Sequence, residues 1–77
     1  MIAFSPDGAV LAVGLKDGAI SLLEADSGEL RQALTGHLDG VTSLAFSPDG
    51  LWLASGSLDD SIILWGIPEN RNRMSFP

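Results

Sequence analysis

The sequence predicts an all-β protein made of two copies of one four-stranded antiparallel unit. The hexapeptide AFSPDG begins at Ala3 and again at Ala45, an offset of 42 residues, and half of the residues in 1–24 are identical to their counterparts in 43–66. Turn-forming residues recur at short and regular intervals, and apolar segments of strand length separate them. Repeats of this length cannot bury their faces without neighbours, so we expect the two units to stack.

The turns are recognised by their chemistry. Proline presets one turn dihedral, glycine accepts positive φ, and aspartate bonds its own backbone, as in Ser-Pro-Asp-Gly at 5–8 and 47–50. The last expected segment is poor in apolar residues and is the weakest of the set. We expect no helices. The expected strands lie near residues 1–4, 9–14, 19–24, 29–34, 41–46, 51–56, 61–66 and 72–76.

Several of these strands are apolar at consecutive positions, as in Leu51–Ala54 and Ile62–Trp65. A sheet with one wet face would alternate polar and apolar residues along each strand. The pattern therefore predicts that both faces of a sheet are covered.

The composition limits the classes of partner and site that the chain can have. The formal net charge is −6, which disfavours nucleic acid and anionic membranes because both need a cationic face. No apolar run approaches the roughly 20 residues that span a bilayer. The chain has no cysteine, hence no disulfide and no thiolate metal site, and it suits a reducing compartment. We expect a cytoplasmic protein without a cofactor.

The second copy carries a recognisable order of motifs. Gly36 and His37 precede a strand at 41–46, the Ser-Pro-Asp-Gly turn follows, and two further strands end at Trp65. In this order and period the chain resembles the WD-repeat β-propeller family. It departs from the family at Gly66, where aspartate is usual, and the first copy has Leu23-Glu24 in place of the Trp-Asp pair. The resemblance implies a first blade at 1–35, without a preceding Gly-His loop, and a second at 36–77.

The resemblance also implies a structural hydrogen-bond network inside the second blade. Its members by position are His37, Ser55, Asp59 and Trp65. The first copy keeps only the aspartate, Asp17, so that blade should be less rigidly specified. Four apolar residues are expected to pack between blades, although the aromatic ones could instead form a surface for ligand stacking. These are Phe4, Phe46, Trp52 and Ile63.

A serine, a histidine and an aspartate in one network also invite a hydrolase interpretation. No Gly-x-Ser-x-Gly elbow occurs, and buried polar groups must satisfy one another in any case, so we expect no enzyme. Calcium binding is most plausible at Asp59-Asp60, but aspartates occurring one per turn favour turn formation. His37 is the only histidine and cannot build a metal site in one chain.

Two blades leave two open faces. Identical chains could close a ring head to tail, as a homotrimer with six blades or a homotetramer with eight. Alternatively, the chain is part of a longer propeller. Its ends fall between blades, so we expect no blade shared between the two termini, and we expect Ile63→Glu to disperse a ring.

The function expected from the resemblance is a non-catalytic scaffold that binds proteins or peptides on the face of the ring. The alternative is a structural element whose property is self-assembly, with no partner of its own. Residues in exposed turns differ between the copies, Leu15-Lys16 against Ser57-Leu58, which accommodates a partner site without identifying one.

Overall fold

The computed structural model describes residues 1–67 with their side chains and the backbone of 73–76. These residues form eight strands in two antiparallel sheets with the orders β1-β2-β3-β4 and β5-β6-β7-β8. The predicted all-β meander is confirmed, while residues 68–72 and 77 of the expected second unit lie outside the described residues. The strands are β1 Ile2–Phe4, β2 Val10–Gly14, β3 Ile20–Glu24, β4 Leu30–Leu34, β5 Val41–Phe46, β6 Trp52–Ser57, β7 Ile62–Gly66 and β8 Arg73–Phe76.

The repeated Ser-Pro-Asp-Gly segments form the same turn in both sheets. In the first, Asp7 Oδ1 accepts hydrogen bonds from the Ser5 hydroxyl at 2.7 Å and from the backbone N–H of Ala9 at 3.0 Å. Asp49 makes the corresponding contacts with Ser47 and with a backbone N–H two residues on. The turn glycines take φ of +74°, a conformation that other L-residues rarely adopt. These contacts account for the repetition of the hexapeptide.

Each sheet has two faces that alternate along its strands, and we name them by register. The back face of the first sheet carries Val10, Ala12, Gly14, Ile20 and Leu22, and its front face carries Ile2, Phe4, Leu11, Val13 and Leu23. The front face of the second sheet carries Leu44, Phe46, Leu53, Ser55, Ile63 and Trp65, and its back face carries Ala45, Trp52, Ala54, Gly56, Ile62 and Leu64.

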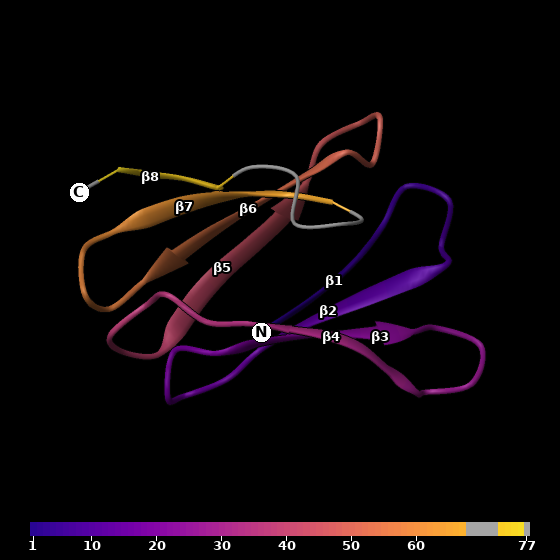
Figure 1. The fold of residues 1–77 in the computed structure, drawn as a ribbon, viewed down its shortest axis with the longest axis horizontal. Coiled ribbons are helices and arrows are strands. Elements are labelled where there is room, and N and C mark those ends of the chain that lie inside the picture. Colours follow the sequence, from indigo (N-terminus) through magenta and orange to yellow (C-terminus); the bar gives the residue numbers. More distant parts are fainter. Residues whose placement is uncertain (68–72, 77) are drawn as a thin grey trace.

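The back face of the first sheet packs against the front face of the second, and one apolar core lies between them. Strand β5 contacts both β1 and β2, so the first strands of the two sheets are neighbours (Figure 1). The approach is close, because a Cβ on Gly14 would lie 2.6 Å from the Val41 side chain. A backbone hydrogen bond of 3.1 Å, from the Val41 N–H to the Leu15 carbonyl, joins the sheets at this point.

The Ile63→Glu variant does not isolate a contact between chains. Ile63 is 2% exposed and lies in the core between the two sheets of one chain. A charge at this position would therefore disrupt the fold of the chain before it tested any contact with a second chain. Within the described residues, each sheet has only one covered face, and the front face of the first and the back face of the second are open.

Candidate functional site

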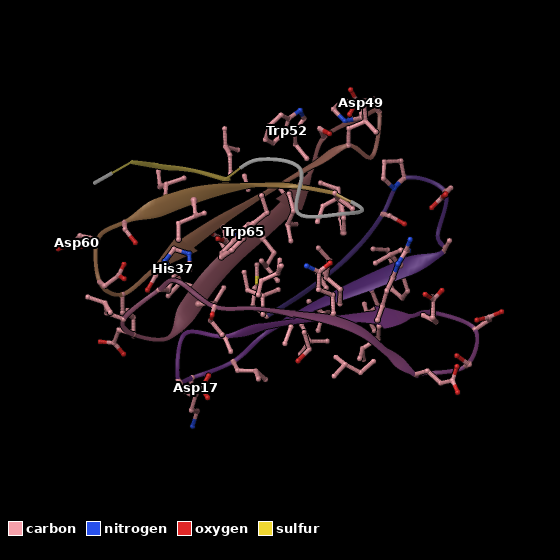
Figure 2. All side chains as sticks on the ribbon, in the orientation of Figure 1. Asp17, His37, Asp49, Trp52, Asp60 and Trp65 are labelled. Carbon is pink, nitrogen blue, oxygen red and sulfur yellow. The ribbon has the colours of Figure 1, made fainter. Side chains whose placement is uncertain are left out.

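His37 reaches from the loop between β4 and β5 into the second sheet, where its ring is buried. Its Nε2 lies 2.7 Å from Ser55 Oγ on β6, and its Nδ1 lies 2.9 Å from Ser61 Oγ in the turn before β7. The indole N–H of Trp65 donates to Ser55 Oγ at 2.9 Å. Figure 2 shows His37 and Trp65 next to each other, and their rings meet edge to face. These contacts join the β4–β5 loop to β6, to the β6–β7 turn and to β7.

Asp59 closes the outer end of the network. Its Oδ2 accepts the backbone N–H of Leu38 at 2.7 Å, and its Oδ1 accepts both the N–H of Ser61 at 2.9 Å and the Ser61 hydroxyl. The Leu38 N–H first, and then the Ser61 hydroxyl, hold the pKa of Asp59 well below its ordinary value. Asp59 Oδ1 is 3.7 Å from His37 Nδ1, so the serine hydroxyl carries the connection between them.

The hydrogen bonds of the network form one directed chain when His37 is neutral with its proton on Nδ1. Trp65 donates to Ser55, Ser55 donates to His37 Nε2, and His37 Nδ1–H donates to Ser61, whose hydroxyl donates to Asp59. Each hydroxyl then accepts one bond and donates one. Among the described residues, no buried side-chain nitrogen or oxygen lacks a partner. Such a fully satisfied network fixes one arrangement of the segments it joins.

Ser61 is the member that the sequence analysis missed. Its signal is the spacing Asp59-Asp60-Ser61, since a serine two residues after a turn aspartate can bond back to the carboxylate. Ser55, the candidate nucleophile of the hydrolase interpretation, is 1% exposed and is hydrogen bonded to His37 and Trp65. The arrangement therefore holds loops in place and offers no open approach to its serine.

The equivalent place in the first sheet has no such network. Val13 and Leu23 occupy the positions of Ser55 and Trp65 and lie on the open front face. Asp17 accepts the N–H of Ala19 at 3.0 Å and forms a local turn. Figure 2 shows Asp17 at the β2–β3 turn of the first sheet. Asp49, at the β5–β6 turn, lies at the far end of the second sheet from His37.

The remaining predicted residues fall in different environments. Phe46 packs against the core between the sheets, and Ile63 lies within that core, whereas Phe4 is 58% exposed. Trp52 is half-buried on the back face of the second sheet. Asp60 has a φ of +68°, as turn formation requires, and the described residues contain no cluster of His, Asp and Glu side chains that could hold a metal ion. The described residues include no helix that is long and apolar enough to cross a membrane.

Two four-stranded meanders packed face to face, with neighbouring first strands, are two blades of a β-propeller. The family model described as WD domain, G-beta repeat matches residues 28–66, and that of the anaphase-promoting complex subunit 4 WD40 domain matches residues 1–40. The chain belongs to the WD40 repeat family. A comparison with curated protein sequences finds no significant match.

Solved structures show the same arrangement. The chain is similar to the β-propeller domain of Cps50 (Swd1) from Myceliophteria thermophila, with 27% identity and a TM-score of 0.88 over 97% of this chain and 24% of that one. It is also similar to the WD40 repeats of RRP9 and to U3-55K, each with 36% identity and a TM-score of 0.87 over 95% of this chain and 23% of the other. The chain thus spans about a quarter of the length of these structures.

Proposed function

We propose that this chain is a non-catalytic scaffold for protein–protein interaction that assembles from identical two-blade copies. The WD40 family supports the scaffold role, because members of this family generally bind other proteins. The main support for a non-catalytic role is that the polar side chains of the His37 network, which could otherwise support chemistry, are hydrogen bonded to one another. What the chain presents outwards is its turns and two apolar sheet faces.

The assembly supplies the blades that two open faces require. Three copies would give six blades and four copies would give eight, both within the natural range of four to eight. Light scattering after size-exclusion chromatography, across a dilution series, tests this proposal. The expected mass is three or four times 8.1 kDa. A folded species of 8.1 kDa at every concentration would contradict the assembly.

A partner in this proposal is a protein or peptide bound at an end of the blades. A groove of about 480 Å³ lies between the two Ser-Pro-Asp-Gly turns, with Arg31 and Phe46 among its lining residues. Arg31→Glu reverses one charge in this groove, and Lys16→Glu makes the same change outside it, in the β2–β3 turn. Affinity capture from cell extract should lose its partners with the first substitution and keep them with the second.

The alternative is a structural element that only assembles with itself. Capture that recovers this chain alone, under conditions where light scattering shows the assembled form, would favour that alternative. We place the protein in the cytoplasm, without nucleic acid or membrane partners, on the strength of its net charge of −6 and its lack of cysteine. Fluorescence microscopy of the tagged chain in its host tests the localisation.

A further inference from the structure

The repeat pairs covered residues of one sheet with more exposed counterparts 42 positions away in the other. Ile20, on the back face of the first sheet, is 0% exposed, whereas Ile62, at the equivalent position of the second sheet, is 49% exposed. Leu44, on the front face of the second sheet, is 8% exposed, whereas its counterpart Ile2 on the first is 59% exposed. The two open faces are therefore copies of the two faces that already pack together.

The covered interface shows how these faces fit. Gly14 leaves space on the back face of the first sheet, where a built Cβ would lie 2.6 Å from the Val41 side chain and 3.5 Å from the Leu44 side chain. Val41 and Leu44 are thus the two side chains that pack over Gly14, and Leu44 has a counterpart on the front face of the first sheet, Ile2. Because Gly14 also belongs to the repeated sequence, it has a counterpart in the second sheet.

The equivalent surface of the second sheet is not covered by the other sheet, and the Ser43 hydroxyl of the neighbouring β5 borders it, 2.5 Å from the position of a Cβ on Gly56. A recess of about 230 Å³ opens on the back face of the second sheet, and Ala54, Gly56 and Ile62 contribute to its lining. Gly56 is the counterpart of Gly14, and Ile2, on the other open face, is the counterpart of Leu44. The recess and Ile2 lie on opposite outer faces of one chain, so Ile2 cannot fill the recess of its own chain.

The charge distribution favours a second copy as the occupant. The named residues of the two open faces include no charged side chain, although the chain has ten Asp and Glu residues and a net charge of −6. Two acidic chains can approach through these faces without burying a charge. An apolar pair of faces that match each other in shape, on one molecule, suits head-to-tail association, in which each copy uses a different face.

We propose that Ile2 of one copy inserts into the recess beside Gly56 and Ile62 of the next. The front face of the first sheet then packs on the back face of a neighbour's second sheet. This inference rests on the self-association proposed above and names its interface. The contact is heterologous. Each added copy covers one open face of its neighbour and leaves one open face of its own. Closure of the ring covers every open face.

Two variants test this geometry because each removes one face only. Ile2→Glu places a charge on the front face, and Ile62→Glu places one beside the back recess, both at exposed positions that leave the core of the chain intact. Each variant alone should be monomeric, with self-association weakened by about 100-fold or more, because an unpaired charge would be buried. Mixed together, the two variants should form a 1:1 dimer of about twice 8.1 kDa and nothing larger.

The control is Leu38→Glu, which adds the same charge at a side chain that is 89% exposed and lies in the loop before β5, on neither face. It should assemble as the unsubstituted chain does. Circular dichroism should show the same strand content in all variants.

The outcomes separate the two proposals. If the unsubstituted chain is a folded monomer, self-association fails, and further blades of a longer chain become the occupants of the open faces. If it assembles but either variant alone still dimerises, or their mixture does not, self-association stands and the Ile2–Gly56 interface is overturned.

Discussion

The Nδ1 atom of His37 lies 2.9 Å from the hydroxyl oxygen of Ser61 but 3.7 Å from the nearest oxygen of Asp59. The hydroxyl therefore relays the interaction between the imidazole and the carboxylate. One small side chain in a turn thus connects the loop before β5 to the β6–β7 turn.

Replacing the hydroxyl should be costly. In Ser61→Ala, His37 Nδ1 loses its acceptor in a buried site, and we expect the free energy of unfolding to fall by about 1–3 kcal/mol. Ser61→Thr keeps the hydroxyl and should lose less. Ser27→Ala, which removes an exposed turn hydroxyl, is the control. Urea unfolding at one fixed protein concentration measures the three. Equal stabilities for Ser61→Ala and Ser27→Ala would show that the relay is dispensable.

Stability should depend on pH through Asp59. Its pKa is lowered from 3.8 in the folded chain, so at acid pH the unfolded chain binds more protons than the folded one. The stabilisation is therefore present above pH 3.8 and is lost progressively as the pH falls below it. Asp7 and Asp49, whose pKa values are also lowered, act in the same direction. We expect the urea midpoint of unfolding to fall less steeply with decreasing pH, between about pH 6 and pH 2, in Asp59→Asn than in the unsubstituted chain. An unchanged slope would exclude Asp59 as a source of the pH dependence.

Replacing Gly18 by alanine should lower the stability of the chain more than the same change at Gly28, a glycine of similar conformation. Its φ is +96°, and a Cβ there would lie 2.5 Å from the carbonyl oxygen of His37, in the loop that leads into the second blade. Gly28 has a φ of +76° but nothing within 4 Å of the same position. Gly28→Ala should cost about 1 kcal/mol for the backbone alone, and Gly18→Ala should cost roughly 1–3 kcal/mol more. If thermal unfolding shows the same loss of stability for both variants, the His37 loop can move away from Gly18 without a loss of stability.

Ile62 and Ile63 are neighbours on β7 that point to opposite faces of the sheet. Ile63→Glu should unfold the chain, because its charge would lie in the core between the blades. Ile62→Glu should keep the fold and change only the mass in solution. Circular dichroism combined with light scattering distinguishes the two results. A folded Ile63→Glu chain would show that the two blades can separate while each stays ordered.

The sequence determined the local structure of this protein. Repetition of Ser-Pro-Asp-Gly specified two identical turns, because Asp7 and Asp49 bond to the backbone two residues on and need no distant partner. Apolar runs between the turns predicted the strands, whose bounds agree with the expected segments to within about one residue at each described end. The positions of His37 and Trp65 followed from the spacing of motifs in the family that the chain resembles.

The tertiary structure decided what the local pattern leaves open. Ile62 and Ile63 are the same residue type in the same strand, and only the stacking of the blades buries one and exposes the other. The relay through Ser61 was equally invisible, because it depends on how far the His37 loop reaches into the turn. Turn chemistry acts over a few bonds and can be read from neighbours in the chain. Burial and hydrogen bonding across 24 positions depend on how whole sheets are placed against each other.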